Sequence, residues 1–88
     1  AVKKVSEGSV SATLVDPKRI FGAALQHHAN SIILAHNHPS GNIAPSEEDK
    51  KITRRLRLIG QDLELSVIDH LIISGNVYFS FADEGIIS

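Results

Sequence analysis

Stretches in which apolar residues alternate with polar ones, or follow one another without a break, predict the strands of this chain. Residues 2–14 alternate loosely, with Gly8 as an interruption, and this pattern predicts two strands or a single bulged strand. The continuous apolar run SIILA at 31–35 predicts a buried strand. The longer run over 65–74 predicts a further buried strand, and VYFSF at 77–81, which follows a Gly-Asn turn, predicts the last one.

Two segments between these strands have the spacing of amphipathic helices. The first begins at Asp16, a good N-cap, with Pro17 in the first helical position, and we expect it to end near residues 28–30. The second follows Ser46, another N-cap, and opens with three acidic residues that the helix dipole favours. Its predicted buried face consists of apolar residues at i, i+4, i+7 and i+11, which are Ile52, Leu56, Ile59 and Leu63. The order β-α-β-α-β-β predicts an α/β domain with helices packed on a mixed sheet.

The composition is that of one small globular domain. The chain has 88 residues, of which 42% are hydrophobic and 22% charged, and its net charge is −1. This charge balance gives no bulk basic field that would favour nucleic acid. The absence of cysteine excludes disulfides, thiolate zinc sites and a cysteine nucleophile, so any metal must be held by histidines and carboxylates.

Neither a membrane span nor a signal peptide is expected. No stretch reaches the roughly 18 apolar residues that a transmembrane helix needs. The first ten residues contain no apolar run of the kind found in secretory signals. The chain begins at Ala1 and contains no methionine, so we expect it to be part of a longer protein.

The segment that follows the run at 31–35 carries metal-binding chemistry. His36 and His38 lie two residues apart in extended chain, so their imidazoles point to the same face. Such a pair suits a borderline-soft ion such as zinc, and Asp49, in the first turn after Ser46, would add an oxygen ligand. Three protein ligands leave a fourth position for water, whose pKa a catalytic zinc lowers to about 7.

Three further groups of residues have two interpretations each. Ser46 is either only an N-cap or also a hydroxyl donor to a developing oxyanion. Asp69 and His70 either contact the metal ligands or the substrate, or form a polar pair at a strand end; we favour the second. The basic residues at i, i+4 and i+7 of the second helix either contact phosphates or form a solvated face, which we also favour. These basic residues are Lys50, Arg54 and Arg57.

These residues carry a resemblance to a known family. The spacing His-x-His-x7-Ser-x2-Asp resembles the JAMM motif of MPN+ metalloproteases. The fuller string HNHPSGNIAPSEEDKKITRRL at 36–56 resembles the RadC family of bacterial proteins in particular. The segments DHLII at 69–73 and YFSFADEG at 78–85 resemble the same family, so the likeness extends over about 6–87.

The resemblance implies a fold and a set of site residues. The fold would be the α/β fold of JAB/MPN domains, a mixed sheet flanked by helices, with residues 1–88 as the C-terminal part of a longer protein. His36, His38 and Asp49 would be zinc ligands, and Ser46 would stabilise the oxyanion. The motif also needs a general-base glutamate, which we expect upstream of Ala1. Glu7 is the alternative base, although a surface position beside a glycine turn explains it better.

The function that follows is zinc-dependent hydrolysis. We expect a cytoplasmic, bacterial enzyme of the metalloprotease or isopeptidase type, acting on a peptide or isopeptide. The alternative is a nucleic-acid-binding module of a DNA-repair or mobile-element system, with a structural or vestigial metal site. A nuclease is a third possibility, but one zinc held by two histidines and one aspartate suits amide hydrolysis better than two-metal phosphodiester cleavage.

Overall fold

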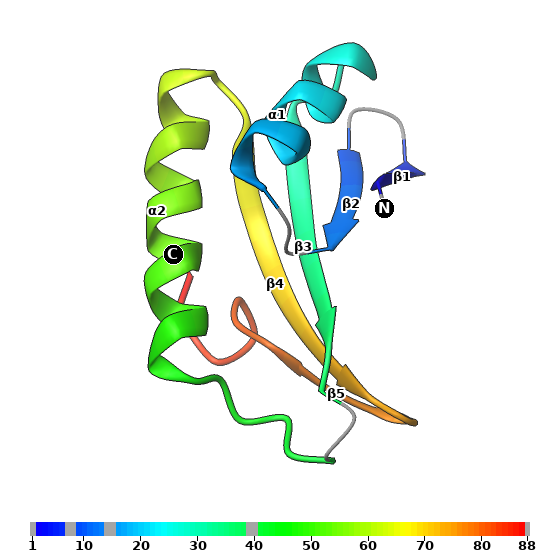
Figure 1. Ribbon diagram of the computed structural model, residues 1–88, viewed down its shortest axis with the longest axis vertical. Coiled ribbons are helices and arrows are strands. Elements are labelled where there is room, and N and C mark those ends of the chain that lie inside the picture. Colours follow the sequence, from blue (N-terminus) through cyan, green and yellow to red (C-terminus); the bar gives the residue numbers. More distant parts are fainter. Residues whose placement is uncertain (1, 7–8, 14–15, 39–40, 88) are drawn as a thin grey trace.

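A computed structural model describes residues 2–6, 9–13, 16–38 and 41–87 of the chain. The described residues form five strands and two helices (Figure 1). In chain order they are β1 (Val2–Ser6), β2 (Ser9–Thr13), α1 (Pro17–Gln26), β3 (Ser31–Asn37), α2 (Glu47–Asp62), β4 (Ser66–Ser74) and β5 (Val77–Ser80). The predicted order is confirmed, with two separate strands at the start.

The five strands form one mixed sheet whose spatial order follows the chain order, β1 to β5. Strands β2, β3 and β4 are parallel, whereas β1 and β5 pair antiparallel with their neighbours at the two edges. Parallel neighbours need a crossover connection, and helices α1 and α2 provide the two crossovers. In Figure 1, α1 crosses in front of β3 and α2 runs alongside β4. The predicted α/β class with a mixed sheet flanked by helices is confirmed.

Both helices contribute to one hydrophobic cluster with the two central strands, so they pack on the same face of the sheet. The cluster comprises Ile20, Phe21 and Ala24 of α1, Ile32 and Leu34 of β3, Leu56 of α2, Leu65 directly before β4, and Val67 of β4. Burial of such side chains contributes roughly 1.5–3 kcal/mol each, before the loss of chain entropy is counted. This core fixes α2 against β3 and β4, and thereby sets the distance between the strand end and the helix start.

Both predicted helix starts are confirmed. The Asp16 carboxylate accepts a hydrogen bond from the Lys18 amide at 2.9 Å, with Pro17 directly after it. Helix α1 ends at Gln26, earlier than the expected 28–30, because His28 adopts a φ of 55° that turns the chain out of the helix.

The end of α2 corrects one expectation. Leu63 was predicted to extend the buried face, but it is 42% exposed and serves as the C-cap after the helix ends. The chain turns there because Glu64 has a φ of 56°, and Leu65 enters the core instead. The Leu65 amide donates to the Gly60 carbonyl at 2.7 Å, so this turn lies directly against the last turn of α2.

Strand β4 contains an irregularity that decides which of its side chains face the helices. Val67 pairs with Ile32, but the next residue of β3 pairs with Asp69, so Ile68 is an extra residue in β4. Such a bulge reverses the alternation of faces that follows it. His70 is consequently buried on the helix side of the sheet, whereas Asp69 lies on the other side.

Candidate metal centre

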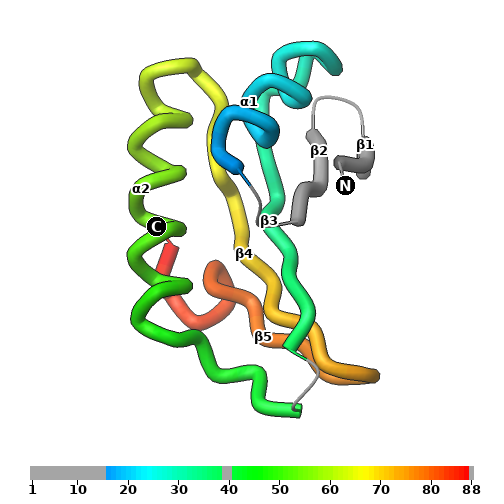
Figure 2. The backbone as a smooth tube through the Cα atoms, viewed as in Figure 1, coloured from blue at the N-terminus to red at the C-terminus, as the bar shows by residue number. Residues whose placement is uncertain are grey.

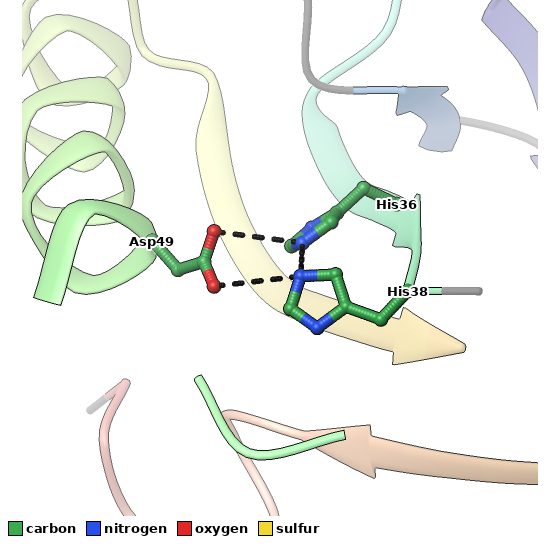
Figure 3. A group of neighbouring side chains, drawn as sticks. All are labelled: His36, His38 and Asp49. Atoms are coloured by element: carbon green, nitrogen blue, oxygen red, sulfur yellow. Dashed lines mark hydrogen bonds and ion pairs between the residues drawn. The ribbon is translucent and has the colours of Figure 1, made fainter. Parts of the chain in front are cut away.

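The predicted ligands meet between the end of β3 and the beginning of α2. Figure 2 shows the segment from residue 41 leading into the start of α2. His36 is the last residue but one of β3, and His38 directly follows that strand. Asp49 lies in the first turn of α2. Figure 3 shows the two rings and the carboxylate pointing toward one another.

The distances between these three side chains are short. His36 Nε2 lies 3.5 Å from Asp49 Oδ1, and His38 Nε2 lies 3.8 Å from Asp49 Oδ2. The two Nε2 atoms are 2.6 Å apart, with the ring centroids at 4.4 Å. All three side chains are partly buried, so the group is reachable from solvent without being fully hydrated.

Helix capping fixes the Asp49 carboxylate. Its Oδ2 accepts from the Ser46 amide at 2.9 Å, while the Asp49 amide donates to Ser46 Oγ at 3.1 Å. This reciprocal pair is a capping box, which satisfies two amides that the first turn of a helix would otherwise leave unpaired. The cap interpretation of Ser46 is therefore observed, and its role toward an oxyanion stays a prediction.

The far nitrogens of both histidines are also engaged. His38 Nδ1 lies 2.9 Å from the Asn42 carbonyl oxygen, which can only accept, so Nδ1 carries a proton and, in the neutral ring, Nε2 has the lone pair. His36 Nδ1 lies 2.9 Å from Nε2 of the buried His70. Both rings therefore direct Nε2 toward Asp49.

The electrostatic environment favours the forms that bind a metal. Burial lowers the pKa of His36 below its ordinary value, although the nearby Asp49 acts in the opposite direction. Burial acts to raise the pKa of Asp49, but the hydrogen bonds from Ser46 and the two histidine rings outweigh it, so this pKa lies below its ordinary value. A neutral imidazole and an ionised carboxylate are the forms in which these side chains coordinate metals.

The three side chains fit a tetrahedral metal ion with a small adjustment. Zinc bonds of about 2.0–2.1 Å place tetrahedral ligand atoms about 3.3–3.5 Å apart. The two histidine–carboxylate distances, 3.5 Å to Oδ1 and 3.8 Å to Oδ2, are close to this range, but they involve different oxygens, so the carboxylate must turn for one oxygen to serve as the ligand. The histidine nitrogens are closer than that, at 2.6 Å, so the rings must separate slightly. The chain thus has a His36, His38 and Asp49 group that could hold a metal ion.

The structure separates the two neighbours Asp69 and His70. His70 faces the metal group, stacks on Phe81 with the ring centroids 4.4 Å apart, and has a pKa lowered by burial to about 4. Asp69 instead accepts hydrogen bonds from the amides of His70 and Ala82 and from the Ser80 hydroxyl. Asp69 therefore ties the end of β5 to β4, which agrees with the strand-end role that we favoured for it. For His70 the favoured interpretation is wrong, because its Nε2 lies 2.9 Å from His36 Nδ1.

One residue near the group was not anticipated from the sequence. Thr53 is 2% exposed, and its hydroxyl lies 2.6 Å from His70 Nδ1. It also donates to the Asp49 carbonyl at 2.7 Å. A signal was present, because Thr53 lies one helical turn after Asp49 and hence on the same face of α2.

Two other expectations concern residues outside this group. Glu7, the alternative general base, lies outside the described residues. Of the basic residues on α2, Lys50 forms an ion pair with Glu47 at 3.4 Å, and Arg54 is exposed.

Comparison with known proteins identifies the family. The model of the RadC-like JAB domain matches residues 1–86. The chain belongs to this family. A UPF0758 protein of Flavobacterium johnsoniae is 43% identical over 83 residues, which are 94% of this chain and 36% of that protein. UPF0758 proteins of Trichlorobacter lovleyi and Clostridioides difficile are 46% and 47% identical, over 96% and 94% of the chain.

This RadC-like JAB domain spans little more than a third of those relatives, 36% and 35% of the latter two. Within the described parts of the domain, neither helix has the length and apolar character needed to cross a membrane.

Proposed function

We propose that this domain binds one zinc ion through His36, His38 and Asp49, and that the protein containing it hydrolyses a peptide or isopeptide bond. The observation that carries the proposal is the convergence of acceptor atoms. In neutral His38 the proton that Nδ1 donates to a carbonyl leaves the lone pair on Nε2, which lies 2.6 Å from His36 Nε2 and 3.8 Å from Asp49 Oδ2. A cation among these atoms would be stabilised by the charge of the carboxylate and by the lone pairs of the imidazoles.

The ligand types favour zinc. Two imidazoles and one carboxylate are a set that zinc uses in catalytic sites, where a fourth position remains for water. When bound, zinc supplies a Lewis acid and makes a water molecule acidic enough to act as a nucleophile near neutral pH.

The other residues have proposed roles around the reacting carbonyl. Ser46 lies at the N-cap of α2, where the helix dipole is positive, and its hydroxyl would donate to the developing oxyanion. A glutamate outside the described residues would take up and return the proton; it is Glu7 or a residue that precedes this segment in a longer chain. Removal of a general base typically lowers a rate by about 10²–10⁴-fold, so the identity of this glutamate decides whether the domain is active by itself.

The metal part of the proposal is tested by zinc content. We expect the purified protein to retain about one zinc ion per chain. His36→Ala and His38→Ala should each lose most of it, since each removes one of three ligands. His27→Ala is the matched control, because His27 is an exposed histidine at the end of α1. Full zinc occupancy in the His36→Ala, His38→Ala double variant would exclude this site.

The catalytic part is tested separately. The full protein is incubated with a peptide library, and newly formed amino termini are measured before and after zinc is removed by a chelator. We expect cleavage that disappears with the chelator, returns with added zinc and is absent in His36→Ala. Zinc bound at this site without any cleavage of peptides or isopeptide-linked substrates would favour a structural role for the metal.

A further inference from the structure

The side of His36 that faces away from Asp49 contacts a buried polar pair, Thr53 and His70. His36 Nδ1 lies 2.9 Å from His70 Nε2, and His70 Nδ1 lies 2.6 Å from Thr53 Oγ1. His70 is 0% exposed and Thr53 2% exposed, so water is excluded from both bonds. The pair thus links α2 through β4 to the last residues of β3.

The direction of these hydrogen bonds follows from the hydroxyl of Thr53. This group has one proton, and it is donated to the Asp49 carbonyl at 2.7 Å. Toward His70 the hydroxyl oxygen must therefore accept, which places a proton on His70 Nδ1. A neutral imidazole then has a lone pair on Nε2, and this atom accepts the proton of His36 Nδ1.

We propose that Thr53 and His70 are positioning residues that hold His36 in the tautomer with the proton on Nδ1 and the lone pair on Nε2. Only this tautomer can use Nε2 as a metal ligand. The opposite tautomer would direct an N–H toward the place where Asp49 and His38 converge. The effect of this positioning on metal binding rests on the proposed function, whereas the tautomer of His36 is a property of the metal-free protein.

The arrangement differs from the one that fixes His38. There a backbone carbonyl, of Asn42, accepts the Nδ1 proton, and a carbonyl can never donate. His36 instead contacts another imidazole, which can donate or accept through the same atom. Its tautomer is defined only because His70 is itself oriented by Thr53. The ring of His70 is held in plane by Phe81, with an interplanar angle of 21°.

The experiment reads the tautomer directly. Long-range ¹H–¹⁵N correlation spectra of the metal-free protein at pH 8 distinguish a protonated Nδ1 from a protonated Nε2 in each neutral histidine. We expect His36 to carry its proton on Nδ1 in the wild type. In Thr53→Val, which keeps the shape but lacks the acceptor, the proton of His70 is no longer held on Nδ1. His36 should then populate the opposite tautomer, and Thr53→Ser should restore the wild-type spectrum.

A second variant covers the case in which Thr53→Val does not fold. His70→Phe keeps an aromatic ring against Phe81 but removes both hydrogen bonds, and it should also abolish the tautomer preference of His36. Affinity for Zn²⁺, measured by competition with a chromophoric chelator, should fall about 10–100-fold in Thr53→Val and His70→Phe but not in Thr53→Ser.

Two results would overturn the inference: a wild-type His36 with its proton on Nε2, or a Thr53→Val protein whose His36 tautomer is unchanged. Failure of the proposed function would look different. The wild type would then bind no zinc, while the tautomer of His36 in the metal-free protein would still respond to Thr53→Val.

Discussion

At the scale of single residues, Ser46 forms two hydrogen bonds with Asp49. Its hydroxyl accepts from the Asp49 amide, and its own amide holds the Asp49 carboxylate. A change at Ser46 can therefore act through helix stability, through the position of Asp49 or through the proposed oxyanion contact. The choice of the substituting residue separates these effects.

We expect Ser46→Asp to leave stability nearly unchanged, because aspartate and serine cap helices about equally well. Hydrolysis should nevertheless be lost, because a carboxylate repels the negative charge that develops on the substrate oxygen. Thermal unfolding and peptide cleavage are measured on the same preparation. Ser46→Ala gives the complementary case, with stability lower by about 1 kcal/mol. Equal cleavage by the wild type and Ser46→Asp would remove Ser46 from the catalytic machinery.

At the scale of elements, local sequence rules predicted the helix starts and the histidine pair. They did not predict which residues of α2 are buried. Asp16 with Pro17, and Ser46, were recognisable because a cap acts within four residues of the chain. Thr53 and Leu63 could not be assigned in this way. Whether a helical position is buried depends on the strand against which it packs. Thr53 is buried beside His70 of β4, whereas Leu63 is exposed.

The last turn of α2 offers a stability test at this scale. A Cβ at Gly60 would overlap the Leu65 carbonyl oxygen and would also meet the Phe21 ring at 3.5 Å. We therefore expect Gly60→Ala to lower the free energy of unfolding by about 1–3 kcal/mol, despite the higher helix propensity of alanine.

Gly22 in α1 is the matched control, since nothing lies within 4 Å of a Cβ at that exposed position. At that position only the higher helix propensity of alanine acts, so Gly22→Ala should raise the free energy of unfolding by about 0.5–1 kcal/mol. Urea unfolding of the two variants measures both changes. Two shifts of the same sign would contradict the packing that is described for Gly60.

At the scale of the whole molecule, the site depends on contacts between segments that are distant in sequence. His36 and Asp49 come together because α2 returns across β3 and β4 on the same face as α1. The spacing of the motif indicated that these residues belong to one site. Alternation along a strand predicts that Asp69 and His70 face opposite sides, but which of the two faces the helices could not be predicted, because it depends on a bulge that is defined only by pairing with β3.

The nucleic-acid alternative is also a question for the whole molecule. The basic residues of α2 extend over about two turns, or roughly 10 Å, which allows two or three phosphate contacts. Each contact contributes about −0.9 to the salt slope, so the total would be near −2 to −3. Because Lys50 already pairs with Glu47, the available charge is smaller still.

We therefore expect no stable complex with duplex or single-stranded DNA at about 150 mM salt, where screening acts within about 8 Å. Titration of labelled DNA over a salt series measures this. Tight binding at that salt, lost in a Lys50→Glu, Arg54→Glu double variant, would place the nucleic-acid module ahead of the hydrolase.

The bulge in β4 decides which side chains of this strand face the helices. If Ile68 paired in regular register instead of bulging, strict alternation from Val67 would place Asp69 on the side of the helices and His70 on the opposite side. Deletion of Ile68 alone removes the extra residue, so Asp69 follows Val67 directly and regular alternation keeps His70 on the side of the helices, opposite Leu34. The face that His70 occupies therefore depends on how β4 pairs with β3 and not on the side chain of Ile68, which is exposed, so most substitutions at Ile68 should leave His70 beside its partners.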